Sequence, residues 1–216
     1  MSSRVGPWAA ADGLRSQDLS LAASWEVPGI WSVAGLADPK HPLLTRRPFR
    51  SPHHTIYPAG LAGGGAVPHP GEITLAHRGV LFLDELPEFR TDTMEVMRQP
   101  LEDGSVTITR AAGSETYPCD FMLVCAMNPC RCGWRGHPSG KCTCSDREVE
   151  KYVEKISGPL LDRIDLHVNV PSVEYEAMRR RETPESSADV KKRVDGARVI
   201  QSARFAGSDT VCNAHM

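Results

Sequence analysis

Short apolar runs bounded by polar or glycine-rich stretches set the pattern of this chain. Residues 79–83 and 121–127 are each almost continuously apolar. Runs of this length suit strands that are buried on both faces, as in a parallel sheet. A third run at 166–170 predicts another strand. Alternation over 105–110, followed by a turn and a second short strand near Tyr117, predicts a hairpin.

Helical spacing appears in three further segments. Apolar residues predict a helix over 92–101 that stops at Asp103-Gly104. Ser145 and Glu148 form a capping box, and the apolar residues after them predict a helix over 146–156. An apolar stripe over 187–205 predicts a third helix. Because the predicted strands alternate with helices, we expect an α/β fold.

Two stretches near the N-terminus show no sustained periodicity. Residues 1–45 contain four prolines and several glycines, and we predict that they are irregular or peripheral. Residues 46–70 are rich in His, Pro, Gly and Arg, with three glycines in a row at 63–65. Such a composition predicts a loop or a flexible insert.

The overall composition is that of an ordinary globular protein. Of the 216 residues 40% are apolar and 24% are charged, and 25 Lys and Arg stand against 27 Asp and Glu. The net charge of −2 excludes a polycation wrapped on nucleic acid, although it permits a local basic patch. The longest apolar run is far shorter than the ~18 residues of a membrane-spanning helix, and the N-terminus opens no signal-peptide stretch. We expect a soluble, cytoplasmic protein without a membrane partner.

Polar residues that follow the apolar runs are candidates for nucleotide chemistry. Asp84 and Glu85 end the first run, Asn128 follows the second, and Arg163 has an acid near it on each side. In nucleotide hydrolases such acids hold magnesium and orient the attacking water, and an arginine from a neighbouring subunit stabilises phosphoryl-transfer charge. The alternatives are a helix cap at Asp84, a solvated Glu85 and a turn at Asn128 before proline. For Arg163 the alternative is a surface ion pair with Asp162 or Asp165.

The cysteines suggest a metal site. Seven cysteines cannot all be paired, and a cytosolic chain keeps its thiols reduced. Four of them form two Cys-x-Cys pairs nine residues apart, which suits a tetrahedral zinc site, with His137 as a substitute ligand. The alternative is four reduced thiols in an exposed loop. The ligands would be Cys130, Cys132, Cys142 and Cys144.

Four arginines make the region up to the first apolar run, at 79–83, locally basic. They are Arg46, Arg47, Arg50 and Arg78. Guanidinium groups clustered in this way suit DNA phosphates. They suit a solvated face or a subunit contact equally well, and we favour this second interpretation.

Several longer motifs occur in a fixed order along the chain. These are PFRSPHHT at 48–55, GVLFLDELPEF at 79–89, RQPLEDG at 98–104, AMNPC at 126–130 and SGPLLDRIDLH at 157–167. In this combination the sequence closely resembles the ComM/YifB family of magnesium chelatase-like AAA+ ATPases, over roughly residues 30–205. The resemblance implies an incomplete three-layer αβα P-loop NTPase core with a Gly/His-rich insert, a β-hairpin and a Cys-rich loop.

The resemblance also implies a division of the chain. Residues 1–29 match nothing in the family that we recognise, and 30–172 correspond to the AAA+ core from the Walker B motif to the arginine finger. Residues 173–216 correspond to the start of a C-terminal helical lid region.

Functional roles follow from the same resemblance. It implies that Asp84 and Glu85 are the Walker B pair, with Asp84 holding Mg²⁺ through the nucleotide, that Asn128 is sensor 1 and that Arg163 is an arginine finger acting in trans. The implied cofactors are ATP and Mg²⁺. The implied assembly is a hexameric ring that binds DNA and drives branch migration during natural transformation.

One departure from the family pattern concerns the phosphate-binding loop. No G-x-x-x-x-G-K-[ST] motif precedes Asp84, and the nearest match, at 136–142, has the wrong glycine spacing and lies after Walker B. We therefore expect a fragment of a longer ATPase that is inactive as an isolated chain. The alternatives are a partner subunit that lacks the nucleotide loop and a motor subunit of a metal chelatase.

Overall fold

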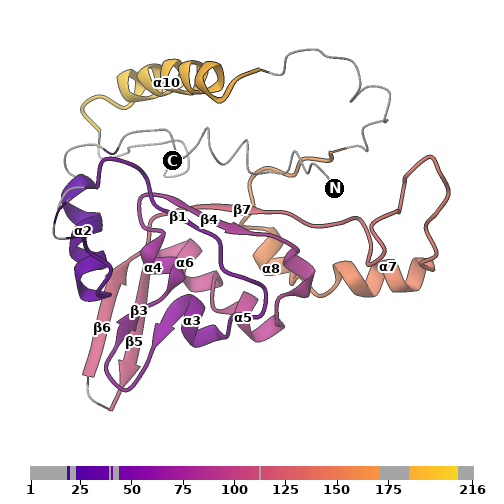
Figure 1. Ribbon diagram of the computed structural model, residues 1–216, viewed down its shortest axis with the longest axis horizontal. Coiled ribbons are helices and arrows are strands. Elements are labelled where there is room, and N and C mark those ends of the chain that lie inside the picture. The colour runs from indigo at the N-terminus through magenta and orange to yellow at the C-terminus, as the bar shows by residue number, and fades with distance from the viewer. Residues whose placement is uncertain are drawn as a thin grey trace.

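A three-stranded parallel sheet organises the protein. The computed structural model describes residues 19, 23–38, 40, 44–111, 113–170 and 185–208 (Figure 1). In the sheet, β4 (Val80–Leu83) lies between β1 (Phe49–Arg50) and β7 (Met122–Cys125). Val80 pairs with Met122 and Leu83 with Cys125, so β4 and β7 end together. Both predicted strands are present, and the α/β class is confirmed. Only β4 is buried as predicted, because β7 lies at the edge of the three-stranded sheet, where Met122 is exposed and the other three residues are half-buried.

Short helices cover one face of this sheet. They are α3 (Pro58–Ala62), α4 (Glu72–Leu75), α5 (Thr91–Glu95), α6 (Arg98–Asp103) and α8 (Gly158–Leu161). Figure 1 shows them gathered on one side, with α10 (Ser187–Arg204) running along the other side. Leu81 and Leu83 point into the core on the helical side, whereas Phe82 stacks on Phe49 with ring centroids 6.2 Å apart. All four residues of β4 are buried, as their apolar run predicted.

The prediction of a loop over 46–70 is wrong, because this region contains regular structure. Strand β1 pairs in parallel with β4, helix α3 follows, and β2 (Gly63–Gly64) pairs antiparallel with β3 (His69–Pro70). Glycine makes the second pairing possible. A β-carbon on Gly63 would lie 2.6 Å from the carbonyl oxygen of His69, and its φ of 111° disfavours other residues.

The prediction that residues 1–45 are irregular is wrong over α2 (Ala23–Val33). Pro28 and Gly29 obscure the helical pattern, since both lower helix propensity. Tertiary contacts outweigh this cost, because Val27 and Ile30 are buried and the Trp31 indole N–H donates to the Leu75 carbonyl at 3.3 Å. The remainder of 1–45 lies largely outside the described residues.

The helix predicted over 92–101 is interrupted, giving α5 and α6. Pro100 explains the break, since it has no N–H to donate and its ring crowds the carbonyl of residue 96. The predicted hairpin is confirmed as β5 (Ser105–Arg110) and β6 (Gly113–Pro118), with Arg110 paired to Gly113. A short 3₁₀ turn, η1 (Leu86–Glu88), follows β4.

Towards the C-terminus the predictions have mixed outcomes. Helix α7 (Asp146–Val153) begins with the predicted capping box at Ser145, and α10 is confirmed. The strand predicted over 166–170 is wrong: it has no strand partner among the described residues, and Leu166, Val168 and Val170 are at least 80% exposed. The predicted lid region lies partly outside the described residues, at 173–184 and 209–216. No helix in the described part of the chain is long and apolar enough to cross a membrane.

Candidate functional site

The carboxyl edge of the sheet brings Asp84, Glu85 and Asn128 together. Asp84 and Glu85 directly follow β4, and Asn128 is the third residue after β7. Two backbone hydrogen bonds hold these strand ends in register: the Ala126 N–H donates to the Leu83 carbonyl at 2.9 Å, and the Leu86 N–H donates to the Ala126 carbonyl at 3.0 Å. In open α/β sheets this is the edge at which ligands bind.

The chain turns sharply at Glu85, directly after Asp84. Glu85 has left-handed backbone angles (φ 54°, ψ 47°), which cost a non-glycine residue about 1–2 kcal/mol. Asp84 supports the turn, since its Oδ1 accepts from the Glu85 N–H at 2.9 Å. Glu85, not Asp84, is the residue that precedes η1, so Asp84 is not the N-cap that the alternative interpretation required.

His54 is a neighbour of Glu85 that the sequence did not reveal. Its Nδ1 lies 3.5 Å from Oε2 of Glu85. Its ring is tilted by 35° relative to that of His53, with centroids 4.0 Å apart, and meets Phe89 edge to face. Strand β1 could have indicated the position of His54, because β1 runs parallel to β4 and the residues that follow both strands lie at the carboxyl edge of the sheet. A strand of two residues, however, leaves no recognisable pattern in the sequence.

Helix α7 packs against this edge through Tyr152. Burial raises the pKa of the Tyr152 phenol, and the charges of Glu88 and Glu85 raise it further, while the Asn128 backbone N–H donating to the hydroxyl opposes the shift. Lys155 adds a second contact, because its Nζ donates to the Pro87 carbonyl at 2.9 Å. The residues just after α7 are therefore fixed to η1 through Lys155.

Arg163 lies apart from this group. Its guanidinium is paired with the carboxylate of Glu102 on α6 and donates to the Pro159 carbonyl. Its Nε is buried without a hydrogen-bond partner. No contact in the described residues links it to Asp84, Glu85 or Asn128 of its own chain. The ion pair is formed with Glu102 and not with Asp162 or Asp165, the two acids near Arg163 in the sequence.

The four clustered cysteines converge as a metal site requires. Their Sγ atoms all lie within 4.8 Å of one another. The Sγ of Cys130 is 3.3 Å from that of Cys132 and 3.8 Å from that of Cys142, and Cys132 and Cys142 are 3.7 Å apart. Thiolates bound to one zinc at ~2.3 Å in a tetrahedron would be about 3.8 Å apart. This donor set therefore fits Zn²⁺ in number, type and spacing.

Backbone amides favour the thiolate form of one member of this cluster, Cys132. The N–H groups of Trp134 and Thr143 donate to the Cys132 sulfur and lower its pKa to about 6. His137 is not required as a ligand, because its Nδ1 lies 2.7 Å from Oγ of Ser139 and its ring faces the edge of Trp134. The arrangement thus favours four sulfur ligands over three sulfurs and an imidazole.

Comparison with known proteins identifies the family to which this chain belongs. The sequence profile of the family described as "Magnesium chelatase, subunit ChlI" matches residues 16–178. YifB of Escherichia coli K12 is 43% identical over 188 residues, which cover 87% of this chain. Competence protein ComM of Haemophilus influenzae is 44% identical over 161 residues, which cover 74% of it. The chain belongs to the ComM/YifB family of magnesium chelatase-like AAA+ ATPases.

The matches also define what part of the family proteins this chain represents. It spans 37% of the length of YifB and 31% of the length of ComM. Among solved structures, NtrX from Brucella abortus in complex with ADP covers 85% of this chain and 36% of its own, with a TM-score of 0.41 and 17% identity.

In this member of the ComM/YifB family the predicted basic patch is largely used internally. Arg50 donates two hydrogen bonds to Glu72, at 2.5 and 2.7 Å. Arg78 pairs with Glu26 and Asp120, and Arg47 donates to the Arg78 carbonyl at 2.6 Å. Side chains held by their own protein are poorly placed to bind DNA phosphates. These contacts within the chain are neither the solvated face nor the subunit contact of the second interpretation.

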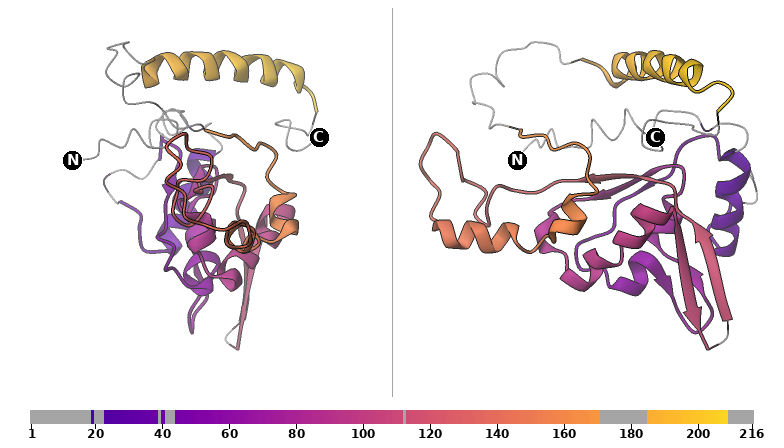
Figure 2. Two further views of the ribbon diagram at one scale, coloured as in Figure 1. Left: turned by 90° about the vertical axis from the view of Figure 1, so that its right-hand side faces the viewer. Right: turned by 180° about the vertical axis from the view of Figure 1, so that it is seen from behind.

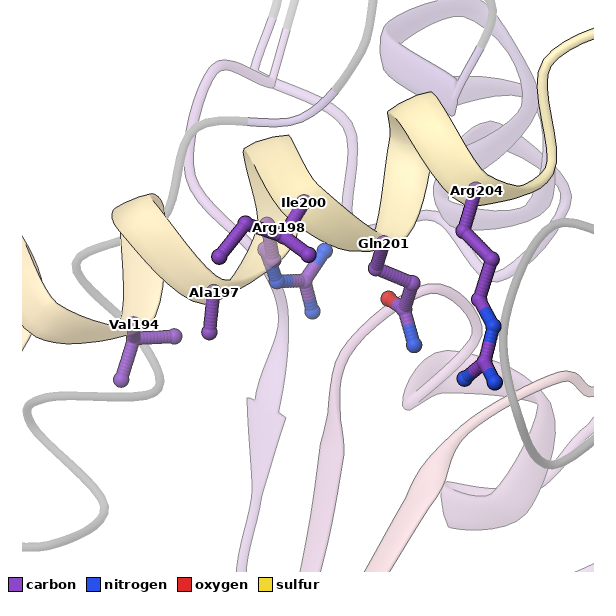
Figure 3. A pocket seen from close by; sticks show the side chains of 6 residues that line it. All are labelled: Val194, Ala197, Arg198, Ile200, Gln201 and Arg204. Carbon is purple, nitrogen blue, oxygen red and sulfur yellow. The ribbon is translucent and has the colours of Figure 1, made fainter.

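A separate hollow of about 250 Å³ lies along α10, away from the two acids. Figure 3 shows Arg198, Gln201 and Arg204 projecting from the helix on the same side as Val194 and Ala197. It brings together neither the acids nor the cysteines, and we assign it no part in nucleotide chemistry.

Proposed function

We propose that this chain supplies the hydrolytic edge of an AAA+ ATPase of the ComM type. The observation that carries the proposal is the placement of Asp84, Glu85 and Asn128 at the ends of two adjacent parallel strands in fixed register. Asp84 would hold Mg²⁺ on the nucleotide, Glu85 would orient the attacking water, and Asn128 would bind the γ-phosphate or that water. Each residue then performs the role that its family motif implies.

The nucleotide also needs a phosphate-binding loop. Its backbone amides and lysine hold the phosphates, and the 216 residues contain no such motif upstream of Asp84. We therefore propose that the chain acts together with a segment that provides this loop and hydrolyses no ATP by itself. A partner subunit without a nucleotide loop remains the alternative form of this proposal.

The finer proposal is that a ring, taken from the family to be a hexamer, remodels DNA by branch migration. Its support is the family and the 44% identity to a protein named for competence. In such a ring Arg163 would leave Glu102 and reach the nucleotide of the neighbouring subunit. A metal-chelatase motor is the second candidate, because the matching family profile is described by that activity. The motifs at 48–55 and 126–130 favour the ComM type.

We propose further that the cysteine cluster binds one structural Zn²⁺. Zinc analysis of protein purified under reducing conditions should give about one ion per chain. Replacing any of the four cysteines by serine should abolish it, whereas Cys212→Ser, outside the cluster, should retain it. Metal-free protein with four titratable thiols would contradict the proposal. The four ligands are Cys130, Cys132, Cys142 and Cys144.

The ATPase proposal is tested in a family protein that carries both these residues and the phosphate-binding loop. Glu85→Gln should retain ATP in a filter-binding assay but release phosphate at least about a hundredfold more slowly, because an amide cannot orient water as a carboxylate does. Glu88→Gln, on the same turn, is the matched control and should remain active. Unwinding of a forked DNA should fail with the same variant. Equal turnover of both variants would remove Glu85 from the reaction.

A further inference from the structure

The chain that follows β1 brings two histidines to the carboxyl edge of the sheet. His53 and His54 belong to the motif at 48–55, and β1 within that motif runs parallel to β4. Figure 2 shows this chain leaving the sheet and passing to α3 on the face that the short helices cover. The motif has no role among the residues assigned to nucleotide chemistry, yet it ends beside Glu85.

Hydrogen bonds hold the backbone around His54 in one conformation. The Ile56 N–H donates to the His53 carbonyl at 3.0 Å, and the Thr55 N–H donates to Nδ1 of His53 at 3.4 Å. Thr93 on α5 ties this turn to the core, because it is completely buried and its Oγ1 donates to the Ile56 carbonyl at 3.3 Å. His54 therefore projects from a fixed turn.

Two aromatic rings fix the imidazole of His54. The ring of His53 lies with its centroid 4.0 Å away, and the ring of Phe89 meets it edge to face at 6.3 Å. Phe89 is itself buried in the core, directly after η1. With the imidazole held in this way, its Nδ1 lies 3.5 Å from Oε2 of Glu85.

The backbone of Glu85 is fixed, but its carboxylate has few contacts. Asp84 Oδ1 accepts from the Glu85 N–H and holds the left-handed turn. The Glu85 side chain is 50% exposed, and in the part of the chain that the structure describes no other ion pair or hydrogen bond reaches its carboxylate. The orientation of this carboxylate therefore depends on His54.

The chemistry of the two groups decides what the contact can do. A carboxylate only accepts hydrogen bonds, so Nδ1 of His54 has to carry the proton that faces Glu85. A bond to Oε2 leaves Oε1 for the attacking water. Contacts of this kind are often long in a protein without substrate and shorten in the reacting complex.

We propose that His54 is the positioning residue for Glu85: its Nδ1–H holds Oε2, so that Oε1 faces the attacking water. The proposal rests on the ATPase function proposed above. His54 touches neither the nucleotide nor the water. Its loss should therefore slow the hydrolytic step and leave ATP binding unchanged.

The kinetic experiment uses the family protein that carries the phosphate-binding loop. His54→Ala should lower kcat at least about tenfold and change KM for ATP by less than about twofold. His54→Asn, whose amide nitrogen can occupy the place of Nδ1, should keep kcat within about threefold of the parent. His69→Ala, on the exposed side of β3, is the matched control and should hydrolyse ATP as the parent does.

A double-mutant cycle tests whether His54 acts through Glu85. In the Glu85→Gln background the carboxylate is already lost, so adding His54→Ala should slow the residual single-turnover rate by less than about twofold. If the two losses multiply instead, His54 acts elsewhere and the inference is wrong. Unfolding midpoints of all variants show whether any loss of rate comes from loss of the fold.

Imidazole NMR signals give a readout that does not depend on turnover. In long-range ¹H–¹⁵N spectra of the 216-residue chain at about pH 7.5, His54 should carry a proton on Nδ1. His77 is the internal reference, because its Nδ1 accepts from the Asp120 N–H at 3.0 Å and therefore carries none. Glu85→Ala should convert His54 to the Nε2–H form and leave the His77 signals unchanged.

The results that would overturn the inference are distinguishable from failure of the ATPase proposal. Slow turnover in Glu85→Gln together with parental turnover in His54→Ala would remove His54 from its role and leave the ATPase proposal standing. An Nδ1 of His54 without a proton would do the same. A loss in His54→Ala that His54→Asn does not restore would assign His54 to packing. Parental turnover in Glu85→Gln would overturn the ATPase proposal and this inference with it.

Discussion

The guanidinium of Arg163, after α8, is paired with the carboxylate of Glu102 at the end of α6. The pair holds Arg163 within its own subunit, with its side chain only 21% exposed. An arginine that acts on a neighbouring subunit has to exchange this partner for phosphate charge. In the proposed ring, the nucleotide of the neighbouring subunit and Glu102 would therefore compete for the Arg163 side chain.

Arg163→Ala is expected to reduce ATP hydrolysis in the assembled ring about a thousandfold without preventing ring formation, because the guanidinium acts across the interface. Hydrolysis is measured by phosphate release and assembly by light scattering. Mixing Arg163→Ala subunits with Glu85→Gln subunits should restore partial activity. In a mixed ring, an intact Arg163 can then face an intact Glu85.

Glu102→Gln is the companion variant. It removes the charge that holds Arg163 and should leave hydrolysis equal to or higher than that of the parent. Intact rings without any rescue in the mixtures would show that Arg163 does not act in trans.

ATP is expected to bind the isolated chain weakly. The acids and Asn128 alone provide few contacts to the phosphates, and the cradle of backbone amides is missing from the sequence. Calorimetry with Mg²⁺ and ATP should show a dissociation constant no tighter than about 1 mM, which corresponds to ~4 kcal/mol of binding free energy. Micromolar affinity would contradict this expectation and require a different phosphate site.

What the sequence predicted of the fold depended on local signals. The strand β4 was visible because four consecutive apolar residues are buried on both faces, and α7 because its capping box is complete. Strand β1 was not visible, since its two residues form a strand only through pairing with β4. The run at 166–170 has the apolar pattern of a strand but lacks a partner in the described structure, so its side chains remain exposed.

The residues of the candidate site also fall into two groups, those with a local sequence signal and those without one. Asp84, Glu85 and Asn128 could be named because each follows a recognisable strand, and the cysteines because their spacing is local. His54 and Tyr152 could not be named in advance. Their importance comes from contacts between segments that are distant in the sequence, and neither has a neighbouring residue pattern that indicates those contacts.

Two leucine substitutions separate the true strand from the false one. Leu83→Ala should lower the free energy of unfolding by about 2–5 kcal/mol, because it opens a cavity among completely buried residues. Leu166→Ala should change it by no more than about 0.5 kcal/mol, because that side chain is 82% exposed. Urea unfolding followed by circular dichroism measures both. A large loss with Leu166→Ala would mean that 166–170 is buried after all.

A buried histidine makes the stability of the chain depend on pH. His77 is 2% exposed, its Nδ1 accepts from the Asp120 N–H at 3.0 Å, and its Nε2 lies 3.3 Å from Oε2 of Glu26. Burial lowers the pKa of His77, the hydrogen bond to Glu26 opposes this, and the charge of Arg78 lowers the pKa further. Protonation of Nδ1 would also break the bond from Asp120.

The sign of the pH dependence follows from this lowered pKa. The pKa of histidine in the unfolded chain is ~6.5. Below that pH the unfolded chain therefore binds a proton at His77 that the folded chain does not bind. The contribution of neutral His77 to the free energy of unfolding is fully present above pH ~6.5, and it is lost as the pH falls through the pKa of His77 in the folded chain. The free energy of unfolding should therefore be lower at pH 5.5 than at pH 7.5. His77→Gln, which keeps an acceptor but cannot titrate, should flatten this dependence, whereas the exposed His167→Gln should not. An equal slope in His77→Gln would assign the dependence to other groups.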